Sequence, residues 1–206
     1  MAKRKRRARA EDSAASSPDP AVASAQQRVL EYLNAGARLL AQHKPGEAAA
    51  LLEDALALDP HNVAIAINLG GAYILQRRYA KAVPLLEAAC QREPDNAMAW
   101  VNLAAAYLGR LELSDVHQQD RAIDAFERAL LADPQTPHVN YNLGLIYKER
   151  GDVARAMAHF WRALEIDPDD RDARYWIELL GRSDATDPAR SGDDADGASS
   201  SEASPL

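Results

Sequence analysis

Apolar and polar positions recur along the middle of this chain at a spacing much longer than one helix or strand. Between residues 21 and 180, an acidic residue followed by proline occurs four times, with successive spacings of 34, 40 and 34 between the prolines: Pro60, Pro94, Pro134 and Pro168. An asparagine that precedes small or apolar residues recurs with spacings of 34, 34 and 40: Asn34, Asn68, Asn102 and Asn142. The two series predict four repeats of one common length, with a six-residue insertion between Asn102 and Pro134.

Each repeat is predicted to contain two helices. The apolar positions are filled mostly by Ala and Leu, whereas the 206 residues include only 2 Phe, 3 Trp and 7 Tyr. Ala and Leu have high helix propensities, and the aromatic and β-branched residues that strands prefer are scarce. Proline cannot donate the helical hydrogen bond and clashes with the preceding turn, so each of the four prolines should follow the end of a helix. The pattern predicts an all-α fold.

The repeat resembles the tetratricopeptide repeat (TPR) family, whose unit is a 34-residue pair of antiparallel helices. The repeats are counted from Val29, Val63, Ala97 and Pro137. Position 8, a small residue in the family, is then Gly36, Gly70, Ala104 and Gly144. Position 24, a large apolar residue, is Leu52, Leu86, Phe126 and Phe160. The family's tryptophan at position 4 is kept only by Trp100. The resemblance implies a right-handed α-solenoid of four helix-turn-helix repeats plus a C-terminal capping helix.

The predicted TPR domain occupies residues 19–182. Its repeats are 29–62, 63–96, 97–136 with the insertion, and 137–170, followed by a cap at 171–181. The first helix is expected to extend back to Pro20, and Ser114-Asp115 is expected to cap the helix after the insertion. Residues 1–18 and 183–206 are rich in Ser, Ala, Asp, Gly and Pro, so a basic N-terminal tail and an acidic C-terminal tail are predicted to be disordered.

Composition and charge exclude several classes of function. The net charge is −7, although residues 1–10 alone carry six basic side chains. The acidic body is a poor platform for nucleic acid, because phosphate binding needs basic side chains. The sequence shows neither a signal peptide nor a run of about 20 apolar residues that would span a membrane, so a cytoplasmic protein is expected. The single cysteine, Cys90, falls at an apolar helix position, and the 5 histidines are dispersed. We therefore expect no metal, no cofactor and no enzymatic activity.

The resemblance implies that positions 2, 5, 6, 9, 12 and 13 of each first helix line a concave face. Position 6 is asparagine in every repeat: Asn34, Asn68, Asn102 and Asn142. An amide donates and accepts, so these side chains could hold the backbone of an extended peptide. Alternatively, asparagine is simply the residue most common at this position of the family.

Apolar residues accompany the asparagines: Leu33, Ile67, Val101 and Tyr141 at position 5, Ile74 at position 12 and Met98 at position 2. An open groove would expose them as an apolar stripe, which soluble monomers rarely leave uncovered. The expected function is that of a protein-interaction scaffold or adaptor, which binds an extended or helical apolar segment in this groove. The alternative is a structural protein that self-assembles through its groove or its repeat ends. The carboxylate clamp of TPR co-chaperones is not expected, because only Asn68 matches it.

Overall fold

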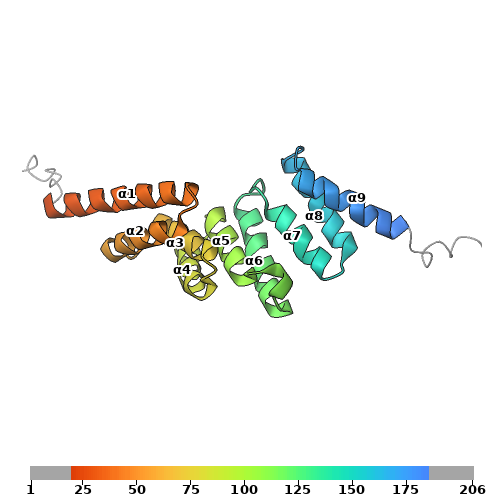
Figure 1. Ribbon diagram of the computed structural model, residues 1–206, viewed down its shortest axis with the longest axis horizontal. Helices are drawn as coiled ribbons and strands as arrows, with labels where there is room; N and C mark the ends of the chain where they lie inside the picture. Colours follow the sequence, from red (N-terminus) through yellow and green to blue (C-terminus); the bar gives the residue numbers. More distant parts are fainter. Residues whose placement is uncertain (1–19, 186–206) are drawn as a thin grey trace, which may run out of the picture. The chain divides into compact units, whose positions relative to one another are not determined.

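The computed structural model describes the backbone of residues 20–185 and the side chains of residues 24–182 (Figure 1). Every regular element within this span is a helix, which confirms the predicted all-α class. The helices are α1 (Pro20–Ala41), α2 (Pro45–Leu58), α3 (Val63–Leu75), α4 (Tyr79–Arg92), α5 (Ala97–Leu108), the 3₁₀ helix η1 (Leu111–Leu113), α6 (Val116–Ala132), α7 (Val139–Glu149), α8 (Val153–Ile166) and α9 (Arg171–Ala185). The chain divides within α4 into two compact units, residues 1–89 and 90–206.

Local sequence explains where the helices begin and end. Asn62 and Asn96 are N-caps whose side-chain oxygens accept hydrogen bonds from Ile65 N (3.2 Å) and Ala99 N (3.3 Å). The second helix of each pair ends two residues before the repeated proline, as predicted. The fourth repeat begins differently, because His138 has a left-handed backbone (φ 62°) and α7 starts only at Val139.

The first unit is built on close packing of α1, α2 and α3. A Cβ atom added to Gly36 would lie 2.6 Å from Leu52 Cγ, and one added to Gly70 would lie 2.6 Å from Leu86 Cδ2. Position 8 and position 24 therefore meet in each of these repeats, and only a residue without a side chain allows the contact. The predicted extension of the first helix is confirmed, since α1 begins at Pro20.

The second unit has one continuous core in which Phe126 and Phe160 are the largest fully buried side chains. α9 covers α8 through Ala173 and Ile177, which are buried, and through Leu180. This arrangement confirms the predicted C-terminal capping helix. The same helix continues to Ala185, so residues 183–185 are helical although they fall in the segment predicted to be a disordered tail. The rest of that segment and residues 1–18 lie outside the described residues.

The insertion forms a defined structure between α5 and α6. η1 is followed by a capping box, in which Asp115 accepts a bond from Gln118 N (2.8 Å) and Gln118 accepts one from Asp115 N (3.0 Å). Ser114 Oγ donates to the Leu111 carbonyl at 2.8 Å. The expectation that these residues cap the next helix is therefore confirmed.

Candidate functional site

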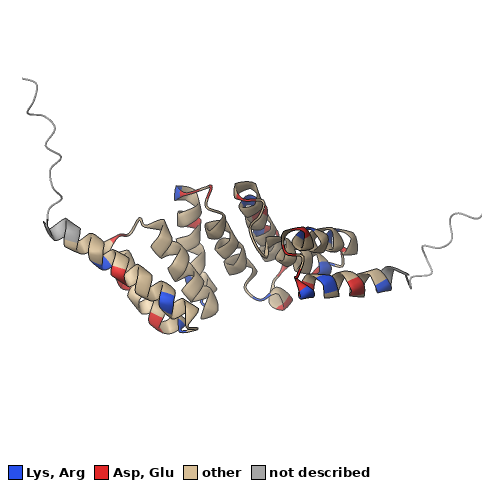
Figure 2. Cartoon of the chain, turned by 90° about the horizontal axis from the view of Figure 1, so that it is seen from above, with Lys and Arg blue, Asp and Glu red and all other residues tan. Residues whose placement is uncertain are grey.

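The first helices of the middle repeats carry no charge. All residues of α3 and α5 are uncharged, and the only charged residues of α7 are Lys148 and Glu149 at its end. The longer helices at the two ends of the chain differ: Figure 2 shows basic and acidic bands along α1 and α9. A helix with one solvated face ordinarily carries charged or polar side chains on that face. α3 and α5 therefore differ from ordinary surface helices, because they carry no charged side chain on any face.

In the first unit, the predicted site residues lie on two helices that pack against each other, α1 and α3. Leu33, Ile67 and Ile74 are half-buried, and Asn34 is exposed. Asn68 is half-buried, and its amide nitrogen donates to the carbonyl of Ala64 in its own helix at 2.8 Å. This bond orients the Asn68 amide along α3.

In the second unit, the predicted residues lie on α5 and α7. Val101 and Tyr141 are half-buried and pack on the same hydrophobic core, whereas Met98 is 52% exposed. Asn102 is half-buried. Asn142 repeats the geometry of the first unit, because its amide nitrogen donates to the carbonyl of His138 at 2.9 Å. The predicted residues of the first unit thus lie on helices that pack together, and Val101 and Tyr141 of the second unit pack on one hydrophobic core. The role of all these residues in peptide binding stays a prediction.

Sequence reasoning missed two aromatic residues on α9. Tyr175 and Trp176 follow Tyr141 and Asn142 by one repeat length, so α9 occupies the place of a fifth first helix. Trp176 stacks on Phe160 with ring centroids 6.4 Å apart, and the Lys148 ammonium lies 4.4 Å from its ring centroid. Extending the 34-residue spacing beyond the fourth repeat would have identified both residues from the sequence.

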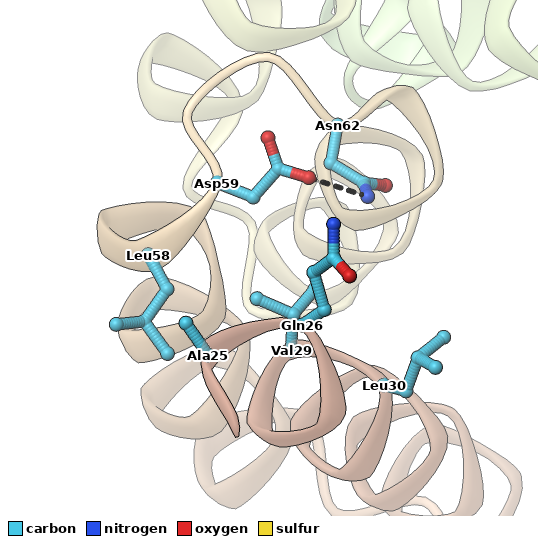
Figure 3. A pocket seen from close by; sticks show the side chains of 7 residues that line it. All are labelled: Ala25, Gln26, Val29, Leu30, Leu58, Asp59 and Asn62. Carbon is cyan, nitrogen blue, oxygen red and sulfur yellow. Dashed lines mark hydrogen bonds between the residues drawn. The ribbon is translucent and has the colours of Figure 1, made fainter. Parts of the chain in front are cut away.

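A pocket opens near the start of the first unit (Figure 3). It is lined by Ala25, Gln26, Val29, Leu30, Leu58, Asp59 and Asn62. Asn62 donates to Asp59 at 3.0 Å, and the Gln26 side chain points toward this pair (Figure 3). Leu30 is 58% exposed at its edge. The pocket combines an apolar wall with a polar edge, and of its lining residues Leu30, at position 2 of the first repeat, belongs to the predicted concave face.

Two of the side chains with a shifted pKa connect neighbouring helices: Tyr73 joins α3 to α2 of the preceding repeat, and His159 joins α8 to α7 of its own repeat. Burial, followed by the hydrogen bond that its hydroxyl donates to Glu53 (2.6 Å), raises the pKa of Tyr73 to about 12. Burial, followed by the charge of Arg162, lowers the pKa of His159 from its ordinary value. His159 Nδ1 lies 3.1 Å from Asn140 Oδ1, and its ring stacks on Tyr147 with centroids 5.4 Å apart. These contacts connect neighbouring helices and show no arrangement of acid, base and nucleophile.

The described residues 24–182 also bear on metal sites and membrane spans. Among those residues, no group of three or more His, Cys, Asp or Glu side chains is placed to hold a metal ion. Of the helices in that span, none combines the length and apolar character needed to cross a bilayer. Cys90 is buried, in agreement with its predicted place in the packing.

Comparisons with known proteins identify the repeat. Three family models described as tetratricopeptide repeat match residues 39–83, 64–106 and 111–171. TTC0263, a thermophilic TPR protein of Thermus thermophilus, is 21% identical with a TM-score of 0.65, and the match covers 75% of this chain and 82% of that one. A mutant of MamA is 30% identical with a TM-score of 0.53, and its match covers 71% of this chain and 86% of its own.

The structure of pilF from Pseudomonas aeruginosa has a TM-score of 0.68 at 18% identity, with 79% of this chain and 71% of that chain covered. No curated protein sequence gives a significant match. The repeat models, the helix pairs and the similarity to MamA agree, and the chain belongs to the tetratricopeptide repeat family.

Proposed function

We propose that this protein is a scaffold that binds an apolar segment of a partner protein, extended or helical, against the first helices of its repeats. Repeat proteins of this kind use extended concave surfaces for binding. The observation that carries the proposal is the absence of charged residues from α3 and α5, although Leu75 is 59% exposed and Met98 is 52% exposed.

The chemistry of these helices favours an apolar partner. Docking on a charged face would remove ionised groups from water, which is costly unless each is paired again. An uncharged face avoids that cost, so the apolar surface buried on docking contributes to the free energy of binding without a charge-desolvation penalty. Ile67 in the first unit and Val101 in the second would supply such contacts, since both are half-buried in the free chain.

The asparagines would contribute directional contacts to the partner's backbone. Asn68 and Asn142 each donate to a carbonyl one turn earlier in the chain, at 2.8 Å and 2.9 Å. A primary amide has two N–H groups and an oxygen with two lone pairs, so one such bond does not saturate it. We propose that Asn34, Asn68, Asn102 and Asn142 bind the backbone while Leu33, Ile67, Ile74, Met98, Val101 and Tyr141 bind apolar side chains.

To test this proposal, peptides would be selected from a random displayed library for binding to the full-length protein. Their affinities would be measured by fluorescence anisotropy for the wild type and for the double variant Asn68→Ala/Asn102→Ala. Loss of hydrogen bonds at two positions is expected to weaken binding about tenfold, which corresponds to about 1.4 kcal/mol. The matched control is Gln91→Ala/Gln135→Ala, which removes two exposed amides that lie outside the predicted site residues.

Salt provides an independent readout. Apolar docking should change little when the ionic strength rises from about 0.05 to about 0.5 M, whereas attraction between exposed charges is screened over this range. Two results would show that the first helices are not the binding face. One is an equal affinity of the selected peptides for Asn68→Ala/Asn102→Ala and for Gln91→Ala/Gln135→Ala. The other is release of these peptides by salt.

A further inference from the structure

A second candidate surface lies on the solvent-facing side of α6. Five exposed residues follow one another along this helix at intervals of three or four residues, and we call them the α6 stripe: Val116, Asp120, Asp124, Glu127 and Leu131. That spacing places them on one face of a helix. Val116 is 66% exposed and Leu131 is 83% exposed, so an apolar side chain stands at each end of three carboxylates.

The basic side chains near the stripe are engaged elsewhere. The guanidinium of Arg121 lies 3.8 Å from the ring centroid of Tyr107, and that of Arg128 lies 5.2 Å from the ring centroid of Trp100. Arg150 bonds to Asp120 at 2.7 Å and is the one cation of this group that reaches the stripe. The middle of the stripe therefore presents a negative surface.

The N-terminal end of the stripe is held in a fixed conformation. Arg150 of the following helix pair donates from Nη2 to the Val116 carbonyl (3.2 Å) and from Nε to Gln119 Oε1 (2.8 Å). Gln119 is buried and donates in turn to Ser114 Oγ at 3.2 Å. Leu113, which is 72% exposed, lies in the segment that these bonds fix. A surface ordered before binding loses less conformational entropy when a partner docks.

We infer that the α6 stripe binds a basic amphipathic helix of a partner protein. Lysine or arginine residues in the middle of that helix would face the carboxylates, and apolar residues toward its ends would contact Val116 and Leu131. The distance from Val116 to Leu131 along α6 is about 22 Å, which corresponds to about four helical turns of the partner. This surface is distinct from the first-helix faces, so the inference does not depend on the proposed function.

The basic segment of the chain itself is a poorer match for this surface. Residues 1–10 carry six basic side chains, but Met1 is their only large apolar residue. Such a segment could neutralise the carboxylates and would leave the apolar ends of the stripe uncovered. The pairing of charge with apolar contact favours a separate helix.

The experiment uses the full-length protein and three synthetic 18-residue probes: a helix of Leu and Lys, the matching helix of Leu and Glu, and the peptide of residues 1–18. Binding would be followed by fluorescence anisotropy. The Leu/Lys helix should bind and the Leu/Glu helix should not. In the variant Asp124→Asn/Glu127→Gln, the affinity for the Leu/Lys helix should fall about tenfold, because loss of each close charge contact is expected to weaken binding.

The matched control, Glu165→Gln/Glu178→Gln, removes the same charge from exposed positions on α8 and α9. It should bind the Leu/Lys helix as the wild type does, whereas the apolar variant Val116→Ser/Leu131→Ser should bind it more weakly. Equal losses in the two carboxylate variants would show attraction by net charge alone and overturn the inference. Binding of the residue 1–18 peptide as tight as that of the Leu/Lys helix would overturn it in favour of the chain's own tail. Circular dichroism of each variant establishes that it is folded.

Discussion

At the scale of single residues, contact between position 8 and position 24 controls how closely the two helices of a repeat approach. In the fourth repeat, a Cβ atom on Gly144 would lie 2.6 Å from Phe160 Cε1. Phe160 is fully buried and stacks against Trp176, so its ring cannot move aside freely. The third repeat is different, because it pairs Ala104 with Phe126, both buried. The family pattern predicted small residues at position 8, but only the structure shows where glycine is required.

The substitution Gly144→Ala should therefore destabilise the protein. Overpacking costs about 1–3 kcal/mol, and the better helix propensity of alanine returns about 1 kcal/mol, so a net loss of up to about 2 kcal/mol is expected. The measurement is the midpoint of urea unfolding. Gly46→Ala is the control, since Gly46 is exposed on α2 with no atom within 4 Å of an added Cβ. If both variants unfold at the same urea concentration, the contact with Phe160 does not limit packing.

At the scale of elements, a cation above a tyrosine ring joins the two helices in three repeats. Lys81 lies 5.5 Å from the ring centroid of Tyr73, and Arg155 lies 4.7 Å from that of Tyr147. Both cations follow their tyrosine by eight residues. In the third repeat the corresponding cation, Arg121, follows Tyr107 by fourteen, and the difference equals the six-residue insertion. The insertion thus leaves the pairing of α5 with α6 in register.

The insertion itself depends on Arg150, and Arg150→Ala should loosen it. The substitution leaves the buried Gln119 oxygen without its donor and removes the bond to the Val116 carbonyl, at an expected cost of about 1–3 kcal/mol. Arg150→Lys should recover little of this loss, because an ammonium cannot reproduce the planar fork of a guanidinium. Thermal unfolding gives the size of the effect, and hydrogen exchange over residues 111–120 gives its location.

A control for this change is Lys44→Ala. Lys44 pairs with Glu47 at 3.7 Å on the exposed start of α2, where an ion pair contributes at most about 1 kcal/mol. Faster exchange confined to the insertion in the Arg150 variant is the expected result. Unchanged exchange there would mean that the capping box of Asp115 and Gln118 fixes the segment without help from the next helix pair.

Sequence and structure differ most where distant elements meet. The repeats counted in the family register begin at Val63 and Ala97, and α3 and α5 begin at these same residues, because caps and helix ends depend on neighbouring residues. The hydrogen bonds of Arg150 could not be predicted in this way, since they join residues 30 or more positions apart. The α6 stripe could not be predicted from sequence for a related reason, since the solvent exposure of a helix face depends on which elements pack beside it. The predicted site residues were placed by family register, and their function stays a proposal.

At the scale of the whole molecule, both proposals require surfaces that are open in the free protein. The first-helix faces and the α6 stripe each expose large apolar side chains, among them Leu75, Met98 and Leu131. Self-association would bury such residues and would compete with any partner. The oligomeric state in solution therefore decides whether these surfaces are available.

We expect a monomer, with a molar mass close to 22.4 kDa at every concentration, when size exclusion is followed by light scattering. The uncharged faces include half-buried positions such as Ile67 and Val101, whose remaining exposed apolar area suits a short partner segment better than the larger interface of a stable dimer. A dimer that forms as concentration rises, and that Ile74→Ser/Met98→Ser dissociates, would instead assign the first-helix faces to self-assembly. A dimer that only Val116→Ser/Leu131→Ser dissociates would assign the α6 stripe to the second copy and leave the first helices free for a partner.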